Sequence, residues 1–227
     1  VLALAVAGLA GCDTVSDMFS SDDKTVLPGK RLSVMELGAQ LEADQELADE
    51  LIILPKPYVN ENWPQPGGTP DNAMYHLAAP GPLDRVWSAN AGAGSSRVGQ
   101  LMAPPVIAEG RIFVLDAEAT VRAFEQSSGK ELWETSLVPE DEDADEGRGG
   151  GVAYDNGRVF VVTGFGTAHG LDAASGAVQW SQAVGDPFRA SPTANGGRVF
   201  AITADNQAIC LAQETGEVLW RHRGIET

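Results

Sequence analysis

Positive charge, cysteine and long hydrophobic runs are all scarce in this sequence. Its 15 lysine and arginine residues face 32 acidic ones, which gives a formal net charge of −17. That balance argues against nucleic acid as a partner, because phosphate binding needs a basic surface. No apolar run approaches the ~20 residues that a membrane-spanning helix needs. Only two cysteines occur in 227 residues, and no metal-binding pattern uses them.

The remaining composition is that of a globular protein. Apolar residues make up 43% and charged residues 21% of the chain, which is too apolar for a disordered protein. With 26 glycines, 13 prolines and 7% aromatic residues, many short elements joined by turns are favoured over a helical bundle. The acidic run at 140–146 (EDEDADE) is interpreted as solvated surface.

The chain begins with a short apolar stretch that ends at a cysteine. Residues 1–10 (VLALAVAGLA) have the length of a signal-peptide apolar region rather than of a membrane span. Residues Leu9, Ala10, Gly11 and Cys12 resemble the lipobox of bacterial lipoproteins. The resemblance implies that residues 1–11 are a signal peptide and that Cys12 carries acyl chains as a membrane anchor. The alternative is a secreted protein with an incidental cysteine.

Two further expectations follow from that anchor. Cys210 would have no partner within the chain, so a buried free thiol is expected there. Asp13 follows the cysteine directly, which leaves inner versus outer membrane open. Residues 12–59 are expected to form a lipidated N-terminus and an acidic tether, and residues 60–227 a partial propeller, for the reasons given next.

The rest of the chain repeats itself. Three units each contain a glycine-led apolar run (GRIFV, GRVFV, GRVFA) and end in a short strand that carries a tryptophan. The interval from glycine to tryptophan is 23 residues in each unit: Gly110 to Trp133, Gly157 to Trp180 and Gly197 to Trp220. Such self-similarity at a fixed period is typical of repeat architectures.

Each unit has the pattern of four short antiparallel strands. An extended piece meets a turn such as Asp155-Asn156-Gly157, which favours a hairpin because asparagine and glycine tolerate positive φ. Two further strands and a second glycine turn follow, which together match a propeller blade. We therefore expect an all-β fold, a β-propeller of four-stranded antiparallel blades, with a linear stack of sheets as the rival. About three blades are present, at residues 88–134, 147–181 and 187–221.

Tryptophan is expected to supply a flat apolar surface between neighbouring blades. The residues concerned are Trp87, Trp133, Trp180 and Trp220. Trp87 is expected to lie in the outer strand of the last blade, contributed by the N-terminal part of the chain to close the ring. Three blades do not close a ring, so the sequence is interpreted as a fragment of a longer propeller.

The repeat ending Gly-x-x-x-Trp resembles that of pyrroloquinoline-quinone-type propellers. With the lipobox and the segment Asn62-Trp63-Pro64-Gln65, the chain resembles the BamB family, lipoproteins of the outer-membrane β-barrel assembly machinery. The resemblance implies an eight-bladed ring that is lipid-anchored in the outer membrane and faces the periplasm. It implies a non-catalytic scaffold without cofactor. The partners it implies are the POTRA domains of a BamA-like protein, other assembly lipoproteins and unfolded outer membrane proteins.

The alternative is a quinone-dependent dehydrogenase, because such enzymes share the repeat. They need a calcium ion, carboxylate and amide ligands and a catalytic aspartate, and often have an adjacent cysteine pair against the cofactor. No two cysteines are adjacent in this sequence. Asp116, Asp172 and Asp205 fall at strand ends, where hydrogen bonds within turns account for them. The three histidines share no ligand spacing and are interpreted as lone polar residues: His76, His169 and His222. No catalytic, cofactor-binding or metal-binding residue is therefore predicted.

Overall fold

The computed structural model divides the chain into two units, Val1–Ile52 and Ile53–Thr227. It describes residues 51, 53–79, 81–96 and 100–224. The predicted signal peptide and lipobox, and most of the predicted tether, lie outside these residues. Within the described residues there is no helix, and so none that could cross a membrane.

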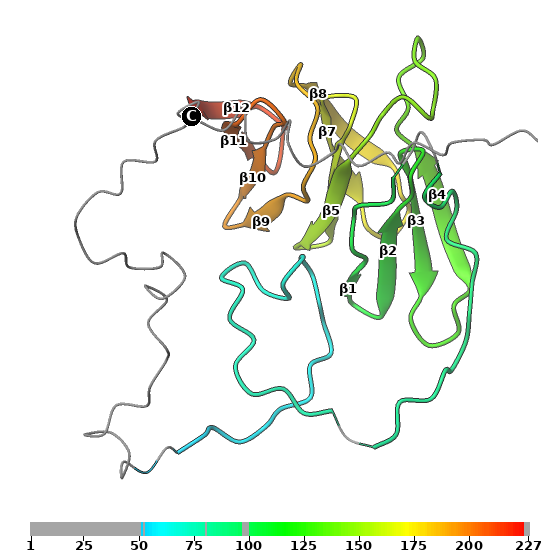
Figure 1. Ribbon diagram of the computed structural model, residues 1–227, viewed down its shortest axis with the longest axis vertical. Coiled ribbons are helices and arrows are strands. Elements are labelled where there is room, and N and C mark those ends of the chain that lie inside the picture. The colour runs from blue at the N-terminus through cyan, green and yellow to red at the C-terminus, as the bar shows by residue number, and fades with distance from the viewer. Residues whose placement is uncertain (1–50, 52, 80, 97–99, 225–227) are drawn as a thin grey trace, which may run out of the picture. The chain divides into compact units, whose positions relative to one another are not determined.

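In the described part of the chain, twelve strands form three separate four-stranded antiparallel sheets, which confirms the predicted fold class (Figure 1). The first sheet contains β1 (Val106–Ala108), β2 (Arg111–Leu115), β3 (Thr120–Glu125) and β4 (Glu131–Ser136). The second contains β5 (Gly150–Asp155), β6 (Arg158–Thr163), β7 (Thr167–Asp172) and β8 (Val178–Ala183). The third contains β9 (Thr193–Asn195), β10 (Arg198–Ile202), β11 (Gln207–Ala212) and β12 (Val218–Arg223).

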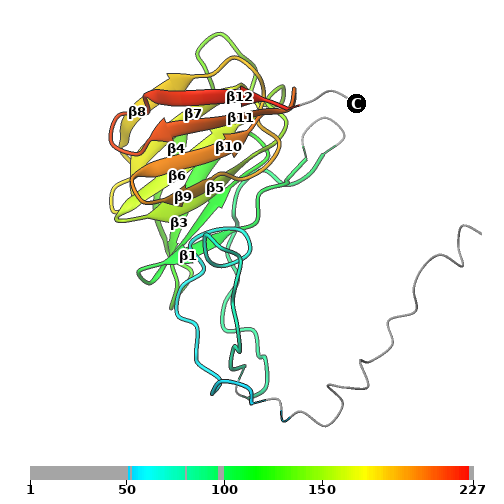
Figure 2. The ribbon, with the colours of Figure 1, turned by 90° about the vertical axis from the view of Figure 1, so that its left-hand side faces the viewer.

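Strands follow one another in chain order across each sheet, as in a propeller blade. Figure 2 shows this for the third sheet, where β9, β10, β11 and β12 lie side by side. The first hairpin of each sheet turns through two residues with positive φ, for example Asn156 (47°) and Gly157 (76°). These are the angles of a type I′ turn, whose twist suits a hairpin and which asparagine and glycine favour.

The hydrophobic core lies between the sheets. One cluster joins the first and second sheets and includes Phe113, Val121, Val159 and Leu171. A second cluster joins the second and third sheets and includes Phe160 and Ile209. Stacking sheet on sheet buries both faces of the middle sheet, and this explains why β5, β6 and β7 are almost entirely buried.

Candidate functional site

The repeated tryptophan occupies the same place in every sheet. Trp133, Trp180 and Trp220 each lie in the outermost strand, opposite Ala123, Gly170 and Cys210 of the neighbouring strand. In each sheet the pairing shifts by a bulge directly after that opposite residue. A bulge bends the strand and re-aims its side chains. The equal spacing in the sequence therefore corresponds to equal positions in three dimensions.

Two of these indoles join their own sheet to the next one. The Trp133 Nε1 donates a hydrogen bond to the Ala173 carbonyl at 3.1 Å, and the Trp180 Nε1 donates to the Gln213 carbonyl at 2.8 Å. In both cases the carbonyl lies three residues before a turn glycine, Gly176 or Gly216. A Cβ built on either glycine would lie 2.4–2.5 Å from the indole ring. Glycine is thus required both by the close approach and by its positive φ.

Trp87 makes the same contact although it lies in no strand. Its Nε1 donates to the Gln126 carbonyl at 2.9 Å, and a Cβ on Gly129 would lie 2.4 Å from its ring. Segment 84–90 therefore places an indole on the first sheet in the way that Trp133 does on the second. Its place in a closed ring, expected from the sequence, is not defined by the described residues.

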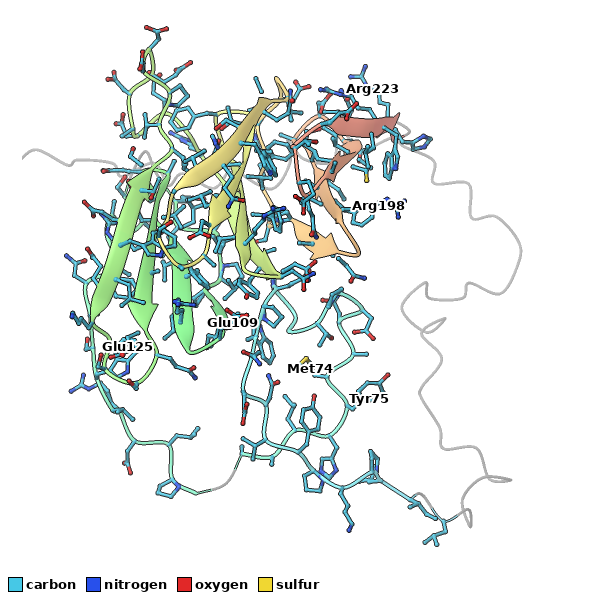
Figure 3. All side chains as sticks on the ribbon, turned by 180° about the vertical axis from the view of Figure 1, so that it is seen from behind. Met74, Tyr75, Glu109, Glu125, Arg198 and Arg223 are labelled. Atoms are coloured by element: carbon cyan, nitrogen blue, oxygen red, sulfur yellow. The ribbon has the colours of Figure 1, made fainter. Side chains whose placement is uncertain are left out.

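Trp220 differs from its two equivalents in exposure. It is 46% exposed, whereas Trp180 is 8% exposed. Phe200 and Ile202 on the same face are 37% and 57% exposed, and with Trp220 they border a groove of about 330 Å³. Arg198, labelled in Figure 3, lies on this side of the third sheet, away from the second sheet. This face is therefore an exposed apolar surface.

A polar network lies at equivalent positions of the first two sheets. In the first, buried Asp116 accepts hydrogen bonds from the N–H groups of Ala93, Glu118 and Thr120 and from Arg122 at 2.6 Å. Burial alone would raise the pKa of Asp116, but these donors outweigh it and hold the pKa below its usual value. Asp116 thus accepts hydrogen bonds within its own turn, as expected from the sequence, and it also binds Ala93 of the preceding segment.

In the second sheet a buried histidine, His169, occupies the repeat position that Arg122 occupies in the first sheet. His169 Nδ1 lies 2.9 Å from Ser181 Oγ, and its Nε2 lies 2.8 Å from Thr167 Oγ1, which in turn lies 2.7 Å from Thr163 Oγ1. Burial lowers the pKa of His169 to about 4, so the ring is neutral at pH 7. His169 was interpreted from the sequence as a lone polar residue. Alignment of the repeats, in which it falls at the position of Arg122, is the signal that could have placed it in this network.

The other residues named from the sequence are distributed as follows. Cys210 is a buried free cysteine, as expected. Residues 140–143, 145 and 146 are exposed. Asp172 and Asp205 accept hydrogen bonds within their own turns. Among the described residues, no three histidine, cysteine, aspartate or glutamate side chains form a group that could hold a metal ion.

Comparison with known proteins shows what this chain is similar to. Residues 117–227 match the family model described as outer membrane protein assembly factor BamB. An uncharacterized protein of Rickettsia prowazekii is 32% identical over 127 residues, which are 56% of this chain and 30% of that protein. The outer membrane protein assembly factor BamB of Burkholderia pseudomallei is 27% identical over 144 residues, 62% of this chain and 34% of that protein.

Solved structures show a similar fold. The quinohemoprotein alcohol dehydrogenase of Comamonas testosteroni superimposes with a TM-score of 0.56 at 23% identity, over 71% of this chain and 27% of that one. At this identity the similarity concerns the fold alone. The chain spans about a third of the length of the curated relatives named above. Residues 117–227 are BamB-like, and the resemblance to the BamB family expected from the sequence is thereby confirmed.

Proposed function

We propose that this protein is a non-catalytic lipoprotein scaffold that assists the folding and insertion of outer membrane β-barrel proteins. The observation that carries the proposal is the match of residues 117–227 to the BamB assembly factors. The stacked sheets support it, because they form a rigid platform with exposed edges and loops on which another protein can dock. Its partners are the POTRA domains of a BamA-like protein, other assembly lipoproteins and unfolded outer membrane proteins.

The proposed location is the periplasmic face of the outer membrane, with acylated Cys12 as the anchor. Residues 1–11 serve as the signal peptide and residues 12–59 as the tether in this proposal. Several acyl chains on one residue would give firm attachment, where a single chain is marginal.

Co-purification tests the proposed partner. The tagged protein is extracted from membranes in detergent, and the bound proteins are identified by mass spectrometry. We expect a large outer-membrane barrel protein with POTRA domains to be recovered. A Cys12→Ala variant is the matched control, because it has no lipid anchor that could bring the two proteins into one micelle. Added to detergent extracts, this variant should still capture the barrel protein; failure of both forms to do so would contradict the proposal.

The second candidate is a quinone-dependent dehydrogenase, because such enzymes share the sequence repeat that ends in Gly-x-x-x-Trp. Quinone, calcium and an alcohol are added to the purified protein, and reduction of an electron-accepting dye is followed. Under the scaffold proposal we expect no quinone-dependent dye reduction. If dye reduction requires the quinone, the scaffold proposal is wrong and the protein is a quinone-dependent dehydrogenase.

A further inference from the structure

A short segment that precedes the first sheet is hydrogen-bonded to all three sheets. In Figure 1 the cyan part of the chain reaches the lower ends of the innermost strands. The main-chain N–H of Trp63 donates to the Ile107 carbonyl at 2.6 Å, and the Trp63 carbonyl accepts from the Ile107 N–H at 2.8 Å. The next carbonyl, that of Pro64, accepts from the Tyr154 N–H at 2.7 Å. Two consecutive residues thus bind β1 of the first sheet and β5 of the second.

The third consecutive residue binds the third sheet through its side chain. The Gln65 Nε2 donates to the Ala194 carbonyl at 2.6 Å, and the Gln65 Oε1 accepts from the Ala194 N–H at 3.2 Å. A carboxamide carries one acceptor and two donor hydrogens, so it can replace a main-chain peptide group in such a pair. The main chain itself turns away at this point, because the Gly68 N–H donates back to the Gln65 carbonyl at 2.8 Å.

The three bound positions are equivalent in the repeat. Each lies three residues before the glycine of the first hairpin turn: Ile107 before Gly110, Tyr154 before Gly157, and Ala194 before Gly197. Each lies on the innermost strand of its sheet, which has a strand neighbour on one side only. An edge strand leaves every second N–H and C=O pointing outward without a partner. Residues 63–65 satisfy such groups at one position per sheet.

The contact between Gln65 and Ala194 is buried, so losing its hydrogen bonds would be costly. Gln65 is 2% exposed. A buried amide is tolerated only where its hydrogen bonds are made, and the Ala194 groups would lose their partner together with it. At the other end, the Glu109 N–H donates to Asn62 Oδ1 at 3.1 Å. Figure 3 shows Glu109 in the turn after β1, beside this segment.

We propose that residues 63–65 form a strap that couples the three sheets, so that their innermost strands open together and not one sheet at a time. The inference is independent of the proposed partner. Its physical basis is that the strap residues are consecutive. A residue that leaves its sheet pulls on the two beside it, because consecutive Cα atoms are held about 3.8 Å apart.

Hydrogen exchange at single amides of the full-length protein tests this coupling. In Gln65→Leu, a variant of similar size, both bonds to Ala194 are lost. We expect exchange to accelerate about tenfold or more at Ala194 and also at Ile107 and Tyr154. The last two amides are decisive, because the main-chain atoms that bind them are unchanged in the variant.

Two controls define the outcomes. Gln182→Leu removes a half-buried carboxamide that donates to the adjacent Ala183 carbonyl, and it should leave all three amides unchanged. The core amide of Val161 in β6 reports general destabilisation. Acceleration at Ala194 alone, or equal acceleration at Val161, would overturn the proposal. If Gln65→Leu does not fold, Gln65→Asn, which keeps a shorter amide, is measured in the same way with the same expectation.

Discussion

At the scale of single residues, the indole of the repeated tryptophan combines two properties. It is flat and apolar enough to cover a glycine turn, and its single N–H reaches the carbonyl three residues before that glycine. Phenylalanine would keep the first contact and lose the second. This explains the recurrence of tryptophan at Trp133 and Trp180, where a neighbouring sheet is present.

Trp180 and Trp220 form a matched pair for measuring this contact. Trp180→Ala removes a buried ring and should lower the free energy of unfolding by about 3–5 kcal/mol. Trp220→Ala should cost about 1–2 kcal/mol, because nearly half of that side chain is already in water. Chemical denaturation monitored by circular dichroism gives both values. Equal losses in the two variants would show that the contact with the next sheet contributes nothing.

His169 provides a prediction about pH. Its pKa is about 4 in the folded protein and 6.5 in the unfolded chain. The unfolded state therefore binds the proton first, and stability falls as the pH is lowered from 6.5 to 4. The contribution lost by pH 4 is about 3 kcal/mol.

The measurement compares the protein with His169→Gln, since carboxylates also titrate in this range. Denaturation curves at pH 7 and pH 4 should show a larger loss of stability for the protein with histidine than for the variant. The same pH dependence in both would mean that the His169 ring is accessible to protons in the folded state.

At the scale of the element, the hairpin turn of one sheet is also the surface on which the previous sheet rests. Gly129, Gly176 and Gly216 each have φ between 71° and 75° and each lie under an indole. Gly110 has the same φ of 71° but has no atom within 4 Å of the position of a Cβ. Comparing the two kinds of glycine separates the cost of backbone strain from that of packing.

Alanine substitutions make that separation. Gly110→Ala should cost about 1 kcal/mol, because alanine is disfavoured in the left-handed region. Gly216→Ala should cost a further ~1–3 kcal/mol, because its Cβ would overlap the Trp180 ring. In Trp180→Ala the extra cost should vanish, which a double-mutant cycle measures as a coupling energy. If the extra cost of Gly216→Ala is the same with and without the Trp180 ring, it does not arise from overlap with that ring.

At the scale of the whole molecule, the proposed anchor residue Cys12 precedes all twelve strands of the described sheets in the sequence. Cys12→Ala should therefore leave the sheets folded and release the protein from the membrane. Cell fractionation should find the variant in the soluble periplasmic fraction and the parent protein with the membranes. A variant that still sediments with membranes would show that Cys12 is not the anchor. Its circular dichroism spectrum should match that of the parent protein.

The family resemblance and the fold class could be predicted from the sequence, because both depend on local regularities. The turn at Asn156-Gly157 and the short apolar runs that form β6 and β10 involve neighbours a few positions apart. Such contacts are dictated by backbone angles and by strand periodicity. The turn hydrogen bonds of Asp172 and Asp205 were anticipated for the same reason.

The amino-acid sequence by itself determined the repeat, its hairpins and the equivalent placing of the tryptophans. Only the tertiary structure decided which groups those repeats bring together: the Trp180 indole and the Gln213 carbonyl, or Gln65 and Ala194, which lie 129 residues apart. It also decided that His169 is buried and neutral. The physical reason is that such contacts arise only when whole sheets stack, and burial of that kind leaves no periodic mark in the sequence.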